Sequence, residues 1–359
     1  MKATGQQAGS SRTPAGEPRL TLRRKILLSS LFALVLLLLA EAGCRVVLRV
    51  AYGARLTEAE RLHEYDSELG WVNMKNRRAV DRYGANNNAT HNSLGLRATR
   101  EYTAAIPAGR YRIVFLGDSF TYGVDADDAG TFVARLESLC PAIETVNMGV
   151  AGYGIDQMYL GYLREQAGLA ADLLVLAFIE DDLRRMKLRG FLTQNPKPRL
   201  LLSGNAVKVT NVPVPTWGLA ANTGWFEEFP NSMALVQILR SVYEIYLQDY
   251  DPLPVAEHVI GALNRLSQEK RQRFALVYLP ARTDLASDRR TAAARHFQEF
   301  AAREHIPFFD LTDPLKMALQ QRDVPLFAAG GGHYSEAGYK LVAESLLSDL
   351  RREFPDVPR

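Results

Sequence analysis

Short apolar runs recur along the chain from Arg112 onward, separated by segments with the residue spacing of helices. Each run is apolar throughout rather than alternating with polar residues, which is typical of strands buried on both faces of a parallel sheet. Five strands are predicted, at residues 113–116, 143–148, 173–178, 274–279 and 307–309. Because helical segments lie between them, the pattern predicts an α/β fold over residues 111–355, a three-layer α/β/α sandwich around a five-stranded parallel sheet.

An insertion at residues 187–252 interrupts this alternation of strands and helices. Within it, apolar runs at 200–202 and 207–209 flank a turn at 203–205, which predicts a β-hairpin. A helix is predicted from about residue 233 to 247. Loops at the carboxyl ends of parallel strands build the binding crevice of such folds, so we expect the insertion to lie beside it.

The N-terminal region carries a continuous hydrophobic stretch. An apolar run covers residues 26–40 and follows a basic cluster at 23–25. Extended to residue 48, it reaches the roughly 20 residues that cross a bilayer, and the positive-inside rule then leaves the rest of the chain outside the cytoplasm. We therefore expect a cytoplasmic tail at 1–25, a transmembrane signal anchor at 26–48, and a stalk with an N-terminal extension at 49–110.

Two processing signals compete with retention of this segment. Ala40-Glu41-Ala42 has the small-residue pattern of a signal-peptidase site. Ala42-Gly43-Cys44 resembles the end of a lipoprotein signal, but Glu41 stands where an aliphatic residue is expected. We expect the segment to be retained, which makes the chain a single-pass membrane protein whose main domain is periplasmic.

Composition narrows the classes of function. The chain has 359 residues, 47% hydrophobic and 23% charged, which suits a globular domain with a sizeable core. A net charge of +3 without a long basic run gives nucleic-acid binding no electrostatic support. The only cysteines, Cys44 and Cys140, imply no disulfide framework, and no Cys or His pair has metal-ligand spacing. No metal or other cofactor is expected.

The strongest chemical signal is Gly117-Asp118-Ser119, which directly follows the first predicted strand. A serine hydroxyl is thereby presented at the end of a strand, beside backbone N–H groups that can bind an oxyanion. Serine needs a base to take its proton, and histidine titrates near neutral pH. Helix capping is the alternative role for Ser119.

Four segments resemble, in order, the sequence blocks of the SGNH/GDSL hydrolase family, whose fold is flavodoxin-like. They are residues 117–119, 147–154, 178–183 and 333–338, and the resemblance runs from about Arg112 to the C-terminus. It implies that Ser119 is the nucleophile and His333 its base. His333 precedes the last predicted helix and can meet Ser119 at the same edge of the sheet, with helix capping as its alternative role. The resemblance also implies an oxyanion hole made by the backbone N–H groups of Ser119 and Gly152 and by the side chain at position 181.

Two positions depart from the family pattern. Three residues before the histidine the family usually has an aspartate that orients the ring, whereas this chain has Gly330. Asp310 and Asp323 are the nearest acids in sequence, and the sequence gives no reason to choose between them. Asp181 stands where the family has the oxyanion-hole asparagine. A carboxylate can donate there only when protonated; alternatively it points away and the hole uses backbone donors alone.

Three functions follow from this pattern. The first is an extracytoplasmic serine esterase or deacetylase acting on an O-acylated glycan or similar ester through an acyl-serine intermediate. The second is an envelope polysaccharide O-acetyltransferase, which would need a partner protein to supply the acyl donor. The third is a catalytically degenerate glycan-binding or envelope-assembly protein. We expect an ester or acylated glycan as substrate, the membrane as a partner through the N-terminal helix, and no nucleic acid.

Overall fold

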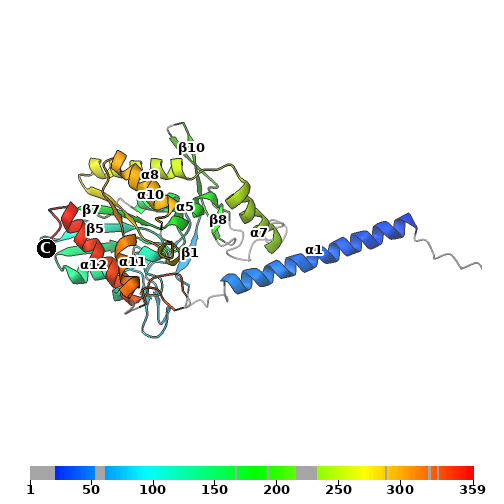
Figure 1. Ribbon diagram of the computed structural model, residues 1–359, viewed down its shortest axis with the longest axis horizontal. Helices are drawn as coiled ribbons and strands as arrows, with labels where there is room; N and C mark the ends of the chain where they lie inside the picture. Colours follow the sequence, from blue (N-terminus) through cyan, green and yellow to red (C-terminus); the bar gives the residue numbers. More distant parts are fainter. Residues whose placement is uncertain are drawn as a thin grey trace, which may run out of the picture.

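A five-stranded parallel sheet forms the centre of the domain, with the strand order β13-β12-β7-β5-β6 (Figure 1). The computed structural model describes residues 21–52, 61–165, 168–191, 195–204, 206–215, 233–287, 289–321, 325–329 and 331–359. The strands of the sheet are β5 (Tyr111–Leu116), β6 (Ile143–Asn147), β7 (Leu173–Phe178), β12 (Arg273–Tyr278) and β13 (Phe308–Asp310). All neighbouring pairs are parallel, so the predicted sheet is confirmed.

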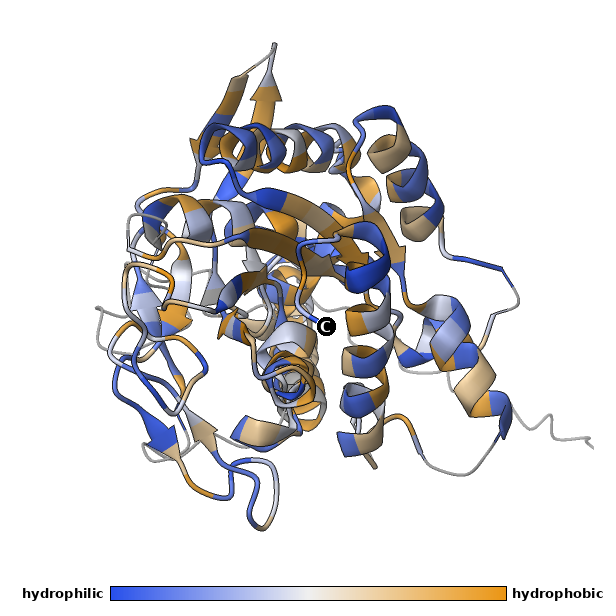
Figure 2. Ribbon diagram, turned by 90° about the vertical axis from the view of Figure 1, so that its left-hand side faces the viewer, coloured by the Kyte–Doolittle hydropathy of each residue, from blue (hydrophilic) through white to orange (hydrophobic). Residues whose placement is uncertain are grey.

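Helices cover both faces of the sheet. On one face lie α3 (Phe132–Leu139), α11 (Thr312–Gln321) and α12 (Glu336–Glu353). On the other lie α4 (Ile155–Glu165), α5 (Glu180–Lys187), α8 (Leu253–Glu269) and α10 (Ala292–Arg303). Figure 2 shows the hydrophobic strands enclosed between helices that alternate hydrophobic and hydrophilic residues. The predicted three-layer α/β/α architecture is confirmed.

Strand β5 illustrates why the strand sequences are continuously apolar. Ile113 and Phe115 pack in the core under α3 and α12, whereas Val114 and Leu116 pack in the core under α4 and α8. Strand order reverses about β5, since β6 lies on one side and β7, β12 and β13 extend the sheet on the other. The carboxyl end of β5 therefore lies at a topological switch point, where parallel α/β sheets bind their ligands.

An N-terminal extension packs against this domain through two small antiparallel hairpins. Their strands are β1 (His63–Asp66), β2 (Gly70–Asn73), β3 (Arg78–Ala79) and β4 (Ala89–Thr90). Trp71 is buried, and its indole N–H donates to the carbonyl of Ala151 at 3.0 Å. Tyr153 returns a hydrogen bond from its hydroxyl to the carbonyl of Trp71 at 2.6 Å. The extension thus contacts the loop that follows β6.

The insertion contains the predicted hairpin and helix. Its elements are β8 (Gly190–Phe191), β9 (Asn195–Pro196), β10 (Arg199–Ser203), β11 (Ala206–Thr210), α7 (Ala234–Val242) and the π-helical turn η3 (Tyr243–Leu247). Strands β10 and β11 pair antiparallel across the predicted turn, which confirms the hairpin. Lys197 anchors the insertion to the core, because its buried ammonium lies 2.5 Å from the buried carboxylate of Asp156 on α4.

Helix α1 (Leu22–Tyr52) projects away from the domain (Figure 1). Its segment Leu22–Val47 is long and apolar enough to cross a membrane, and none of the most apolar window is buried against the rest of the protein. The remaining helical turns are α2 (Ser119–Tyr122), η2 (Asp128–Gly130) and α9 (Arg282–Leu285).

Candidate active site

Ser119 lies at the first position of α2, where the chain turns sharply out of β5. Asp118 caps this helix, because its Oδ1 accepts the backbone N–H of Phe120 at 2.9 Å. Gly123 ends the helix in the left-handed conformation with a φ of 89°, and a Cβ there would lie 2.2 Å from a methyl carbon of Thr131. Local capping thus holds Ser119 at the carboxyl end of β5.

His333 meets Ser119 directly. Its Nε2 lies 2.9 Å from Oγ of Ser119, a hydrogen-bond distance suited to proton transfer. The imidazole packs against Phe120 with the ring centroids 5.1 Å apart. The backbone carbonyl of His333 accepts the N–H of Ala328 at 3.0 Å. The structure therefore brings together the two residues that the sequence singled out.

A buried charge network lies beneath the serine. Nη1 of Arg185 donates to Oδ2 of Asp118 at 2.8 Å and to Oδ1 of Asp182 at 2.5 Å. Burial raises the pKa of Asp182, and the negative charge of Asp118 raises it further. Oδ2 of Asp118 also lies 3.2 Å from Oγ of Ser119. Arg185 therefore neutralises a carboxylate that would otherwise compete with His333 for the serine proton.

Asp125 supplies the carboxylate on the other side of the histidine. Its Oδ2 lies 3.5 Å from Nδ1 of His333, longer than a strong hydrogen bond, although such contacts often shorten when substrate binds. The hydroxyl of Tyr339 on α12 donates to the carbonyl of Val124 at 2.8 Å and so holds the neighbouring backbone. A Cβ on Gly331 would lie 2.6 Å from Oδ2 of Asp125, so a glycine there leaves room for the carboxylate.

Asp125 was not predicted, because the acids expected to orient His333 were those nearest to it in sequence. Of the two candidates that the sequence left open, Asp310 lies 3.3 Å from Arg290 in an ion pair and accepts the backbone N–H of Thr312 at 2.9 Å. Asp323, like Gly330, lies outside the described residues. No spacing in the sequence marks Asp125, since its approach to the ring depends on how the loop after α2 folds back.

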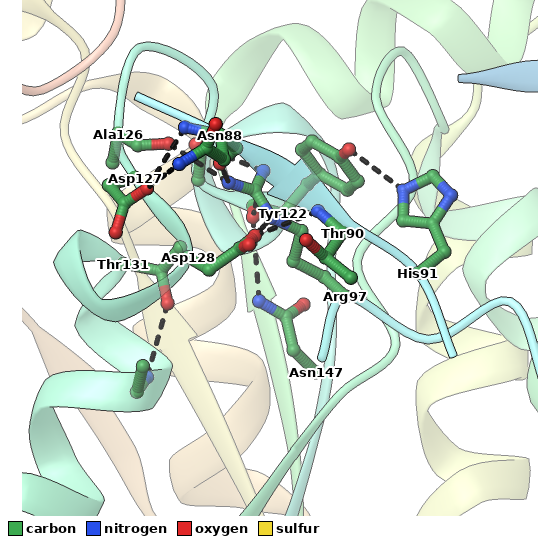
Figure 3. Close-up of polar contacts among 12 residues, drawn as sticks. Asn88, Thr90, His91, Arg97, Tyr122, Ala126, Asp127, Asp128, Thr131 and Asn147 are labelled. Carbon is green, nitrogen blue, oxygen red and sulfur yellow. Dashed lines mark hydrogen bonds and ion pairs between the residues drawn. The ribbon is translucent and has the colours of Figure 1, made fainter. Parts of the chain in front are cut away.

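Arg97 of the N-terminal extension holds that loop (Figure 3). Its buried guanidinium donates from Nε to Oδ1 of Asp128 at 2.8 Å and from Nη2 to the carbonyl of Ala126 at 2.9 Å. It also lies 4.6 Å from the ring centroid of Tyr122. The extension thus fixes the loop on both sides of Asp125.

The second sequence block forms a turn next to the serine. Nδ2 of Asn147 donates to the carbonyl of Thr121 at 2.8 Å, and its Oδ1 accepts the N–H of Gly149 at 2.9 Å. Gly152 has a φ of 85°, a conformation that favours glycine. Within the described part of the chain, the backbone N–H groups of Ser119 and Gly152 donate to no protein acceptor. Both are therefore available for an oxyanion.

Asp181 lies on the first turn of α5. Oδ1 of its carboxylate is 2.8 Å from the guanidinium of Arg184, and the side chain is 49% exposed. The side chain thus contacts Arg184 at the protein surface. A direct role for Asp181 in the oxyanion hole stays a prediction.

A cavity of about 870 Å³ opens at the carboxyl ends of β7 and β12. Residues of α5, α9 and the insertion line it, and charged side chains are frequent among them: Glu180, Asp181, Arg184, Lys187, Asp251, Asp284, Arg289 and Arg290. The guanidinium of Arg282, between two lining residues, donates to the carbonyl of Ala328 at 3.2 Å. The cavity wall is thus bonded to the loop that carries His333, but neither Ser119 nor His333 is among the residues that line the cavity.

The model of the GDSL-like lipase/acylhydrolase family matches residues 115–341, which is more than half of the chain. The chain belongs to this family. It is accordingly an SGNH-type serine hydrolase that acts on ester bonds. The matched region includes the three residues brought together above, Ser119, Asp125 and His333.

Three solved structures are similar to the chain at low identity. A lipolytic protein of the G-D-S-L family from Veillonella parvula DSM 2008 is 15% identical, with a TM-score of 0.41, covering 69% of this chain and 100% of that one. A related protein from Desulfitobacterium hafniense DCB-2 is 16% identical, with a TM-score of 0.39, covering 67% and 100%. A variant of Axe2, an acetyl xylan esterase from Geobacillus stearothermophilus, is 15% identical, with a TM-score of 0.41, covering 67% and 94%. No curated protein matches the chain in sequence.

Proposed function

We propose that this GDSL-family enzyme is a membrane-anchored, extracytoplasmic esterase that removes acyl groups from an O-acylated glycan. The observation that carries the proposal is the 2.9 Å contact between Oγ of Ser119 and Nε2 of His333. A serine bonded in this way to a histidine is the arrangement of an activated nucleophile.

The reaction proceeds in two halves. Oγ of Ser119 attacks the ester carbonyl carbon while Nε2 of His333 takes its proton. The tetrahedral oxyanion faces the backbone N–H groups of Ser119 and Gly152. The protonated histidine then gives its proton to the departing alcohol oxygen, which leaves an acyl-serine. Water, deprotonated by His333, attacks the carbonyl carbon of this ester. The bond to Oγ of Ser119 then breaks, His333 returns the proton to Oγ, and the carboxylic acid leaves.

Asp125 is proposed to orient the ring of His333 during both halves. A carboxylate beside Nδ1 keeps the proton on that nitrogen, which leaves Nε2 unprotonated and able to act as base. Its negative charge also stabilises the imidazolium that forms when the serine proton is transferred. Asp125 would thus replace the aspartate that the family usually has three residues before the histidine, at the position of Gly330 in this chain.

The lining of the cavity supports a glycan as substrate. Charged side chains project from α5 and from residues 251–290, and they are interspersed with the apolar side chains of Ile179, Leu183 and Leu253. A long acyl chain would remove water from these charges without offering hydrogen bonds in return, whereas sugar hydroxyls can hydrogen-bond to them. A small acyl group on a carbohydrate fits such a lining better than a lipid does.

Helix α1 supports the location. The basic residues Arg23, Arg24 and Lys25 precede the apolar run at 26–40, and by the positive-inside rule this supports a hydrolase domain outside the cytoplasm. Alkaline phosphatase fused after Arg359 is therefore expected to be active. An inactive fusion that is stably expressed would overturn this orientation.

A fluorophosphonate probe tests the catalytic part of the proposal. The probe should label the natural protein and Ser138→Ala, which removes an exposed hydroxyl on α3, but not Ser119→Ala. Hydrolysis of p-nitrophenyl acetate should disappear only in Ser119→Ala, with an unchanged melting temperature. Equal labelling and activity in Ser119→Ala would contradict the proposal.

A further inference from the structure

The segment formed by α7 and η3 carries large hydrophobic side chains on its outer face. They lie at positions 239, 242, 243, 246 and 247, the spacing of one side of a helix. Each is between 42% and 74% exposed, and the set consists of Leu239, Val242, Tyr243, Tyr246 and Leu247. We call these five residues the apolar stripe.

The opposite face of the same segment is polar and bonded to the hydrolase domain. Glu244 is buried, and its Oε2 accepts the backbone N–H of Arg189 at 3.0 Å. Nε2 of Gln248 donates to the carbonyl of Lys187 at 2.8 Å. Helices on the surface of a water-soluble domain show the reverse, with their apolar face inward. This inverted arrangement suits a helix whose outer side meets an apolar phase.

Glu41 connects the segment to α1. Its carboxylate accepts the first two backbone N–H groups of α7, from Ala234 at 3.0 Å and from Leu235 at 2.9 Å. Nε of Arg45, one turn further along α1, lies 2.7 Å from the same carboxylate. A charged glutamate in an apolar helix is costly unless its charge is compensated, and the positive end of the α7 dipole together with Arg45 compensates it. Figure 1 shows α7 near the end of α1 that is closest to the hydrolase domain.

The position of Glu41 sets the depth of the contact. From Lys25, at the basic end of α1, to Glu41 the helix rises about 24 Å, against a hydrocarbon core of about 30 Å. The amino end of α7 would therefore lie just inside the outer boundary of the bilayer core, with the rest of α7 extending from there. Tyr243 and Tyr246 belong to the residue type that gathers at this boundary, where an apolar ring and a polar hydroxyl are both satisfied.

We propose that the apolar stripe docks into the outer leaflet of the membrane that α1 spans. The inference rests on the proposed anchor, since α1 and Glu41 bring the stripe to the lipid surface. Docking at two places, α1 and α7, would restrict rotation of the domain about the anchor. Ile245 and Tyr246 line the 870 Å³ cavity, so the cavity would be held next to the membrane surface. The enzyme would then act on acylated glycans that lie close to that surface.

Fluorescence quenching in proteoliposomes of the full-length chain tests this proposal. Single cysteines are introduced at Leu239 and Tyr246 in a Cys44→Ser, Cys140→Ser background, labelled with an environment-sensitive fluorophore, and exposed to nitroxide-labelled phospholipids. Met317 on α11 is the matched control, because it is 57% exposed against 59% for Leu239. Leu36 on α1 is the positive control. We expect quenching at least several-fold stronger at positions 239 and 246 than at 317.

The outcomes separate the two proposals. Quenching at Leu36 without quenching at Leu239 or Tyr246 would overturn docking and leave the anchor intact. No quenching at Leu36 would overturn the anchor itself. Cross-linking between copies through position 239, without lipid quenching, would show that a second copy covers the stripe and would also overturn docking.

A charge introduced into the stripe provides an independent measurement. With the fluorophore at Val242, Tyr246→Glu should lower lipid quenching several-fold, because a carboxylate is expelled from the apolar phase. Met317→Glu should leave it unchanged. Both side chains are exposed, so neither change is expected to alter the melting temperature in detergent. Unchanged quenching in a folded Tyr246→Glu variant would contradict docking.

Discussion

Asp125 and His333 face each other across 3.5 Å, from the carboxylate Oδ2 to the imidazole Nδ1, although they lie far apart in the chain. The other ring nitrogen of His333 is the one that meets Ser119. The carboxylate thus comes from the loop that follows the nucleophile rather than from the segment that carries the histidine. Ser119 and Asp125 are held on one short stretch of chain, and α12 holds that stretch through the bond from Tyr339 to Val124.

Replacing Asp125 should slow catalysis without unfolding the protein. Asp125→Asn is expected to lower kcat/KM for p-nitrophenyl acetate by roughly 10²-fold or more, because the ring of His333 loses its orienting charge. Steady-state rates of hydrolysis at pH 8 measure this loss.

Asp127→Asn is the matched control on the same loop. Asp127 caps η2 and accepts the backbone N–H of Asn88 at 2.9 Å, so its replacement disturbs the loop but not the ring of His333. It should therefore lower kcat/KM much less than Asp125→Asn does. Equal losses of kcat/KM in the Asp125 and Asp127 variants would reject the proposed role of Asp125.

Asp181→Asn tests the remaining oxyanion-hole assignment. Because the carboxylate is paired with Arg184 at the surface, the ratio of variant to natural kcat is expected to stay near one from pH 6 to 9. If Asp181 instead faces the oxyanion, an asparagine that donates at every pH should raise the rate at pH 8 by up to roughly 100-fold. Arg184→Gln serves as the control, because it frees the carboxylate without changing it.

Arg97 should be essential for the stability of the loop after α2. Arg97→Met leaves the carboxylate of Asp128 and the carbonyl of Ala126 without their donor, and loss of one partner from a buried ion pair costs about 3–5 kcal/mol. Esterase activity should also fall, since the loop carries Asp125, whereas Ser138→Ala should leave the activity unchanged. Urea titrations in detergent measure the free energy of unfolding.

Arg100→Met provides a matched comparison. Arg100 forms a 2.6 Å ion pair with Glu137, but its side chain is 43% exposed, and exposed pairs contribute about 0–1 kcal/mol. A variant of Arg97 that is no less stable than Arg100→Met would show that the guanidinium does not hold the loop.

His91 should make the fold sensitive to acid. Burial lowers its pKa to about 3, and its ring contacts the carbonyl of Met74 at 2.9 Å and the hydroxyl of Tyr122 at 2.8 Å. The pKa in the folded state lies below the usual 6.5, so the unfolded chain binds more protons as the pH falls. The contribution of His91 to stability is therefore complete above pH 6.5 and is lost toward pH 3.

The expected loss is about 1.4 kcal/mol per pH unit below the unfolded pKa of the histidine. Urea midpoints of the natural protein should decline between pH 6.5 and 4.5, and less steeply in His91→Gln. His258→Gln, on the partly exposed face of α8, should keep the natural slope. Parallel slopes for His91→Gln and the natural protein would contradict this assignment.

The apolar pattern was sufficient to predict the sheet, the hairpin of the insertion and the helix that includes α7. These elements form from residues that are close together in the sequence. A strand that is buried on both faces needs apolar residues at consecutive positions, as β7 has over Leu173–Phe178. Ser119 was also found from the sequence, because it directly follows a predicted strand, whereas His333 was found through the resemblance to the family.

Only the tertiary structure brought Asp125 to His333, placed Asp181 beside Arg184, and showed Arg97 bonded to the loop after α2. Each of these contacts joins polar side chains whose distance depends on the path of a loop, and no periodicity in the sequence records that path. The same holds for α7: its sequence predicts an amphipathic helix, but which face turns outward was decided by Glu244 bonding to Arg189 and by Glu41 meeting the amino end of the helix. Hydrophobic periodicity specifies that a residue needs a partner, whereas the packing of the whole chain determines which partner it has.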